Sequence, residues 1–158
     1  MDEGAIDPAS LPDRIHHLVE RWAKQAPEAT ALIESGRSLT WRALLEAART
    51  LAAILQEAGV RGGDRVLIVN ENSAAAATAI FAASLLDAWA VPINARLTAP
   101  EIERIREHAR PRAIVFTHGI SAEAAAHAAR HGTAREIETA AGPLRLVGNL
   151  PAKSEPVL

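Results

Sequence analysis

Between Arg37 and Phe116 the hydrophobic pattern alternates between strand-like runs and helical spacing, and few folds accept such a pattern. Short apolar runs such as residues 65–69 (RVLIV) alternate with longer segments whose apolar residues recur every three or four positions. A short run without polar interruption suits a strand that is covered on both faces, as in a parallel sheet. We therefore expect an α/β fold: a parallel sheet, doubly wound, with right-handed βαβ connections.

Capping residues locate the ends of several expected elements. Thr40 can cap one helix through its hydroxyl, and Asn72 or Ser73 can cap the next. Thr98 and Glu101 have the spacing of a capping box. The sequence thus predicts helices at residues 11–25, 41–58, 74–86, 98 to just before Pro111, and 121–130, and strands at 29–34, 37–40, 65–69, 90–93, 113–116 and 144–147.

The chain divides into three parts. Residues 1–10 are expected to form a disordered leader, and residues 11–147 the α/β unit. Within that unit, Ser35-Gly36 between two short strands predicts a small hairpin ahead of the main sheet. Residues 148–158, which contain two prolines, are expected to be a linker.

Composition excludes several classes of function. A net charge of −2 argues against nucleic acid or an anionic membrane as partner, because both need a concentrated basic surface. The absence of cysteine excludes disulfides, thiolate metal sites and cysteine nucleophiles. The start, MDEGAIDPAS, has no basic region followed by an apolar one, and no stretch reaches the ~20 strongly apolar residues of a membrane span. A cytoplasmic protein without a transmembrane segment is the expectation.

Two residue groups invite a functional interpretation but have a stronger structural one. The glycine-rich stretch at residues 59–64 lies between a helix and a strand, whereas phosphate loops run from a strand into a helix. His127 and His131 are four residues apart, but no glutamate or third ligand accompanies them, so we expect surface histidines. His16 and His17 are adjacent and are expected on different faces of their helix. We therefore predict neither metal ligands nor catalytic residues.

Asn94 and Arg96 form a third group with a better claim to function. They follow a predicted strand at its carboxyl end, where open α/β folds place their ligands. The next helix begins at Thr98, and its N-terminus adds a partial positive charge. An arginine there can bind a phosphate through two hydrogen bonds. The alternative is that Arg96 only packs its stem and pairs with Glu101, and the residues alone leave both possibilities open.

Several stretches together resemble the N-terminal subdomain of the adenylate-forming superfamily, in particular its acyl-CoA and aryl-CoA synthetases. Each is weak alone, but the ordered set is specific and covers residues 11–117, with a looser fit at 144–148. The stretches are residues 37–41 (RSLTW), 63–66 (GDRV), 72–73 (NS), 91–98 (VPINARLT) and 114–117 (IVFT).

The resemblance implies a function for the parent enzyme. Such enzymes use ATP with Mg²⁺ to convert a carboxylic acid into an acyl adenylate, and then transfer the acyl group to coenzyme A. Their phosphate loop ending in lysine and their C-terminal lysine domain do not occur in this sequence. We therefore expect an N-terminal fragment that is inactive alone and holds none of these cofactors tightly.

The resemblance also gives Arg96 a role. In aryl-CoA ligases of this superfamily, the arginine of the Asn-x-Arg-Leu stretch contacts a phosphate of coenzyme A. Arg96 occupies that position, and Asn94 is a weaker second candidate. The sequence departs from the usual pattern at Ala95, where proline is common, and at Asp87, where glycine is usual.

An alternative function belongs to another class. The chain could be a stand-alone, non-catalytic domain that binds coenzyme A or another anion, or that mediates an interaction. The expected partner is the rest of the parent enzyme, or a second copy held through uncovered apolar surface. The identity of the acid substrate does not follow from these residues.

Overall fold

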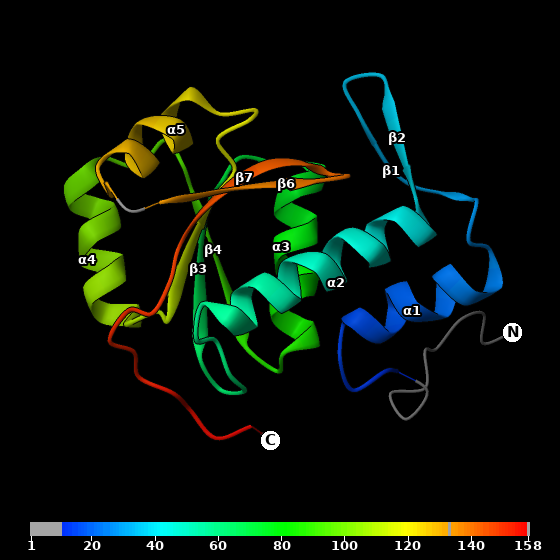
Figure 1. Ribbon diagram of the computed structural model, residues 1–158, viewed down its shortest axis with the longest axis horizontal. Helices are drawn as coiled ribbons and strands as arrows, with labels where there is room; N and C mark the ends of the chain where they lie inside the picture. Colours follow the sequence, from blue (N-terminus) through cyan, green and yellow to red (C-terminus); the bar gives the residue numbers. More distant parts are fainter. Residues whose placement is uncertain (1–10, 133, 158) are drawn as a thin grey trace, which may run out of the picture.

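The computed structural model describes residues 11–132 and 134–157, so the leader expected at residues 1–10 lies outside the described part. Helices and strands alternate along most of the chain (Figure 1). In order they are α1 (His16–Gln25), β1 (Thr30–Glu34), β2 (Arg37–Thr40), α2 (Trp41–Glu57), β3 (Arg65–Asn70), α3 (Ala74–Leu85), β4 (Trp89–Asn94), α4 (Ala99–Ala109), β5 (Ala113–Phe116), α5 (Ala122–Ala129), β6 (Arg135–Thr139) and β7 (Gly142–Val147).

The main sheet has the strand order β4-β3-β5-β7-β6, and β1 and β2 form a separate hairpin. Strand β3 lies parallel to β4 and to β5, which confirms the expected α/β fold. The sheet is not parallel throughout, because β7 is antiparallel to both β5 and β6. Strands β6 and β7 are joined by a two-residue turn, and so short a connection can only join antiparallel strands. The sequence predicted β7 but not β6.

Helices cover both faces of this sheet, as expected for a doubly wound fold (Figure 1). Alternate residues of β3 point to opposite faces, since side chains alternate along a strand. Val66 and Ile68 pack with residues of α2 and α3, whereas Leu67 and Val69 pack with residues of α4 and α5. The uninterrupted apolar run of β3 is thus buried on both sides.

Helix α3 is covered by the chain itself. Its apolar residues face all directions, and most of them are buried against α2, β3 and β4. The Ser73 hydroxyl caps the helix by accepting a hydrogen bond from the Ala76 N–H. The small alanine side chains let neighbouring elements approach closely, so the alanine-rich composition fits this central position.

Helix α1 and the hairpin form the outer part of the molecule. Only Val19 of α1 is fully buried, whereas Ile15, Leu18 and Trp22 of the same apolar stripe are exposed. Trp22 stacks on Trp41 at a ring separation of 6.0 Å and so connects α1 to α2. The described part of the chain therefore covers only part of the stripe that the helical periodicity predicts.

The segment after β7 has no helix or strand, but it is hydrogen bonded to the body of the molecule. Leu150 N–H donates to the Arg112 carbonyl, and Glu155 N–H donates to the Gly63 carbonyl at 2.8 Å. A Cβ atom at Gly63, whose φ is +81°, would lie 1.8 Å from the Glu155 carbonyl oxygen. Residues 148–157, expected as a linker, thus cross the amino-terminal edge of the sheet in close contact with it. We call residues 148–157 the strap.

None of the described helices is long and apolar enough to cross a membrane.

Candidate functional site

A hollow of about 450 Å³ lies where β3 and β4 reach their carboxyl ends. This is the upper end of the sheet in Figure 1, where α3 and α4 begin. Parallel strands place their C-terminal residues at the same edge, which brings the two predicted site residues beside the end of β3. The lining residues are Asn70, Glu71, Asn72, Pro92, Ile93, Asn94 and Arg96.

Arg96 is held at this hollow by two hydrogen bonds. The Asn94 side-chain oxygen accepts from the Arg96 backbone N–H at 2.9 Å, so these two predicted residues do lie together. The Arg96 Nε donates to a Glu71 carboxylate oxygen at 2.9 Å, and that carboxylate raises the pKa of the guanidinium. The side chain remains 71% exposed. Within the described residues its two terminal nitrogens have no hydrogen-bond partner, so they are available to a ligand.

The alternative prediction, that Arg96 pairs with Glu101, was wrong, because Glu101 forms hydrogen bonds with Thr98 instead. A Glu101 carboxylate oxygen accepts from both the Thr98 backbone N–H and the Thr98 hydroxyl, each at 2.7 Å. The bond from the backbone N–H is one half of the capping box of α4, and both bonds lower the pKa of Glu101. Glu71, at the end of β3, takes the place beside Arg96 because the parallel pairing of β3 with β4 brings the two strand ends together.

His127 supports the loop that carries Arg96. It is buried on α5, and its Nε2 lies 3.1 Å from the Ala95 carbonyl oxygen and 3.0 Å from that of Leu97. Both partners accept, so Nε2 carries the proton. The prediction of a surface histidine was therefore wrong for His127. His131 is partly buried, with its ring 5.6 Å from that of Phe116.

Unpartnered polar atoms mark the same edge of the sheet. Asn70 Oδ1, at the end of β3, and Thr117 Oγ1, just after β5, are buried without a hydrogen-bond partner in the described part of the chain. His118 Nδ1 is in the same situation, although its Nε2 lies 3.0 Å from a Glu136 carboxylate oxygen. Buried polar atoms are normally hydrogen bonded. This edge therefore has unused capacity for hydrogen bonds, which sequence patterns do not reveal.

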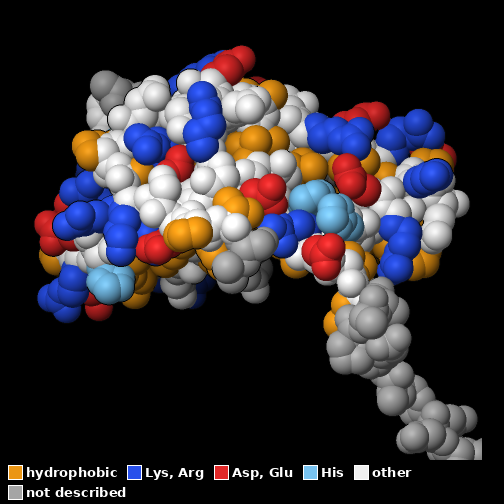
Figure 2. All heavy atoms as spheres, turned by 90° about the horizontal axis from the view of Figure 1, so that it is seen from below, with side chains coloured by type: hydrophobic (Ala, Val, Ile, Leu, Met, Phe, Trp, Pro, Cys, Tyr) orange, Lys and Arg blue, Asp and Glu red, His pale blue; other side chains and the backbone are white. Residues whose placement is uncertain are grey.

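A second hollow, of about 540 Å³, lies at the opposite edge of the sheet and is mainly apolar. Trp89, 51% exposed, lines it together with Ile15 and Val157. Figure 2 shows the molecule from this side, with hydrophobic side chains between charged ones. Beside this hollow, Asp87 forms an ion pair of 2.6 Å with Arg14. Asp87 has a left-handed backbone with φ of +52°.

Comparison with known proteins identifies relatives with similar sequences. A feruloyl-CoA synthase from Amycolatopsis sp is 40% identical over 83 residues, which are 52% of this chain and 17% of that protein. A 3-oxocholest-4-en-26-oate–CoA ligase from Rhodococcus rhodochrous is 36% identical over 91 residues, 58% of this chain and 16% of that protein. The chain thus spans about a sixth of the length of these relatives.

Solved structures share the fold. The anthranilate CoA ligase AuaEII, in complex with anthranoyl-AMP, has a TM-score of 0.63 at 31% identity, covering 68% of this chain and 21% of the ligase. A fatty acyl CoA synthetase from Mycobacterium tuberculosis has a TM-score of 0.58, also at 31% identity, over 61% of this chain and 20% of that chain. The sequence pattern of the AMP-binding enzyme family matches residues 19–155. The chain therefore belongs to the AMP-binding enzyme family.

Proposed function

We propose that this chain supplies a coenzyme A phosphate contact to an ATP-dependent acid–thiol ligase. Such a ligase converts a carboxylic acid to an acyl adenylate and then to a thioester of coenzyme A. The observation that carries the proposal is the guanidinium of Arg96, which Glu71 orients while both terminal nitrogens stay available. An arginine that presents two parallel N–H donors suits a phosphate, because it can bind two oxygens at once.

The surroundings of Arg96 support binding of an anion. The amide side chains of Asn70, Asn72 and Asn94 line the hollow and can each form hydrogen bonds with a polar ligand. Helix α4 begins at Ala99, directly after its N-cap Thr98, and its positive dipole end also favours an anion. Glu71 opposes the anion, so its carboxylate both orients the arginine and limits the affinity.

The sequence offers a phosphate of coenzyme A a matching group of residues around Arg96, but it offers no such group to ATP and Mg²⁺. The sequence has no Ser/Thr/Gly-rich loop ending in lysine, and its lysines, Lys24 and Lys153, stand in no such loop. We therefore assign no step of adenylation to these residues. The chain alone should release no pyrophosphate when it is given ATP and carboxylic acids, which a coupled pyrophosphate assay checks.

Titration of coenzyme A into the purified chain tests the proposal. Arg96→Ala should weaken binding by about 1.5–3 kcal/mol, roughly 10- to 150-fold, because a hydrogen bond to a charged group is lost. Glu71→Gln should strengthen binding, since the amide oxygen can still accept from Arg96 while the negative charge is removed. Pantetheine, which lacks the phosphates, should bind equally to all variants.

Arg104→Ala is the matched control, because Arg104 is an exposed arginine on α4 outside the hollow. It removes the same charge and should leave the affinity nearly unchanged. Equal affinities of Arg96→Ala and the unmodified chain for coenzyme A would contradict the proposal. Equal losses in the Arg96 and Arg104 variants would show a general charge effect and would contradict it as well.

A second candidate function is a stand-alone domain that binds coenzyme A or another anion without catalysis. The observation that favours it is that Glu71 and Asn94, both in this chain, already orient Arg96. Both functions predict binding through Arg96. An assay of a larger protein that contains this chain distinguishes between them. Carboxylate-dependent pyrophosphate release by a protein that contains this chain supports the ligase, whereas binding without such release supports the stand-alone domain.

A further inference from the structure

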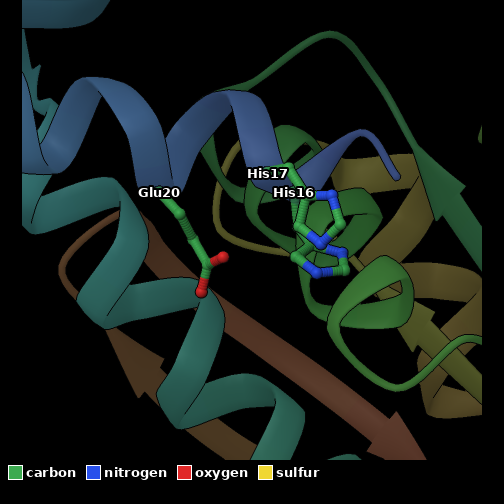
Figure 3. Close-up of side chains that lie close together, drawn as sticks. All are labelled: His16, His17 and Glu20. Carbon is green, nitrogen blue, oxygen red and sulfur yellow. The ribbon is translucent and has the colours of Figure 1, made fainter. Parts of the chain in front are cut away.

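One cluster of side chains outside the Arg96 site has the composition of a metal centre. His16, His17 and Glu20, all on α1, each offer a ligand atom, and these atoms lie within 4.8 Å of one another. Figure 3 shows the three side chains leaving α1 on the same side. We propose that this cluster binds a divalent transition metal ion, with Zn²⁺ as its simplest occupant.

Helix geometry explains why the three side chains meet. Positions four apart lie on one face of a helix, so His16 and Glu20 are neighbours, and His17 lies three residues before Glu20. The imidazoles of His16 and His17 are in edge contact, with ring centroids 4.4 Å apart. The expectation that these two histidines lie on different faces of the helix was therefore wrong.

Ser84 on α3 prepares His16 for coordination. Its Oγ lies 2.9 Å from His16 Nδ1, which leaves Nε2 for a metal. Histidines that bind metals usually hydrogen bond through their other ring nitrogen, and this bond orients the ring.

The donor set indicates which class of metal would bind. Two imidazole nitrogens and one carboxylate oxygen suit Zn²⁺ and its transition-metal neighbours, whereas Mg²⁺ and Ca²⁺ prefer oxygen ligands alone. A hollow of about 520 Å³ adjoins the two histidines and gives water access to a fourth coordination position. The proposed site is thus of the three-ligand type, with a position open to exchange.

Two features of the cluster oppose binding of the metal ion. Arg49 donates to Glu20 Oε1 at 3.0 Å, so coordination would use the other carboxylate oxygen or displace the arginine. Ligands around a tetrahedral Zn²⁺ are roughly 3.4 Å apart, given bonds of about 2.0–2.1 Å. The cluster must therefore contract, which an exposed side chain such as His17 can do by rotation. These features favour a weak, exchangeable site over a permanent structural one.

Calorimetric titration of Zn²⁺ into the 158-residue chain, freed of any purification tag, tests the proposal. We expect one saturable site, and a melting temperature that rises with Zn²⁺ because the ion binds the folded state. His17→Ala should weaken Zn²⁺ binding about tenfold or more, since even changes outside the ligand set cost about 10- to 100-fold.

His17→Ala is the informative variant, because His17 is exposed and its loss should not disturb the contact of α1 with α3. His108→Ala, which removes an exposed histidine on α4, is the matched control and should bind Zn²⁺ like the unmodified chain. Absence of saturable binding at submillimolar Zn²⁺ would overturn the proposal. Equal affinity of His17→Ala and the unmodified chain, or an equal loss in His108→Ala, would overturn it too.

Discussion

The direction of the Arg96 side chain depends on neighbours from three elements. Glu71 at the end of β3 holds the Nε, Asn94 at the end of β4 holds the backbone N–H, and His127 of α5 holds the carbonyl groups on either side. Each bond limits a different degree of freedom of the loop. An arginine oriented in this way loses less conformational entropy when it binds a phosphate than a freely moving one.

His127 should therefore act as a positioning residue for Arg96. His127→Phe has a similar size but leaves two carbonyl groups without their donor, which should lower the free energy of unfolding by about 1–3 kcal/mol. It should also weaken coenzyme A binding. His127→Gln keeps an N–H donor and should retain more of both properties. Chemical denaturation and ligand titration measure them, and equal affinities in the two variants would argue against the positioning role.

The left-handed backbone of Asp87 leads to a second prediction. Its φ of +52° places it in the left-handed region, which costs residues other than glycine about 1–2 kcal/mol. Asp87→Gly and Asp87→Ala both remove the ion pair with Arg14, so the comparison cancels that loss. The glycine variant should be more stable than the alanine variant by about 1–2 kcal/mol in thermal or chemical unfolding. Equal stability would mean that the backbone relaxes at this position.

At the scale of the elements, local signals predicted most of the fold. The capping residues Thr40, Ser73 and Thr98 begin their helices as expected, and the Ser35-Gly36 turn joins β1 and β2. These signals depend on residues close in sequence. The strap and the pairing of Glu71 with Arg96 depend on contacts between distant residues, so no local pattern could predict them.

A comparison of two glycines with nearly the same backbone conformation isolates the contribution of the strap to stability. Gly63 and Gly36 have φ of +81° and +78°, but a Cβ at Gly36 meets no atom within 4 Å, whereas at Gly63 it meets the Glu155 carbonyl. Gly36→Ala should cost about 1–2 kcal/mol from the backbone alone. Gly63→Ala should cost more and release the strap. Unfolding experiments and proteolysis near Glu155 test this, and equal costs would show that the strap contributes little.

The strap also makes stability depend on pH through Asp64, which is buried at the amino-terminal edge of the sheet. Burial raises the pKa of Asp64, but hydrogen bonds from the Ser154 hydroxyl, the Arg61 N–H and Arg112 outweigh it and lower the pKa below its usual value. The charged form therefore stabilises the folded state above about pH 4, and this stability is lost as the pH falls through the lowered pKa.

Asp64→Asn should remove this dependence. At neutral pH the variant should be less stable than the unmodified chain by about 1–3 kcal/mol, because the buried charged acceptor is lost. Below about pH 4 the two should converge. Urea denaturation at a series of pH values measures both, and parallel stability curves down to low pH would contradict the assignment.

At the scale of the whole molecule, the two edges of the sheet differ in character. The carboxyl edge carries the polar hollow around Arg96, and the amino edge carries the strap and the apolar hollow around Trp89. Among the described residues, Trp89 and Ile15 are large apolar side chains left exposed beside that hollow. Exposed apolar surface favours association. We expect the chain to self-associate at high concentration, and Trp89→Glu should reduce this in light scattering.

If Arg96 binds a phosphate of coenzyme A as proposed, the ligand occupies the hollow at the carboxyl edge of the sheet. Nitrogen-15 NMR of the chain during a coenzyme A titration tests this location most directly. We expect the Arg96 Nε–H signal and the amide signals of residues 70–72 and 94–98 to shift together, and pantetheine to leave them unchanged. Shifts that cluster around Trp89, or that persist unchanged in Arg96→Ala, would contradict it.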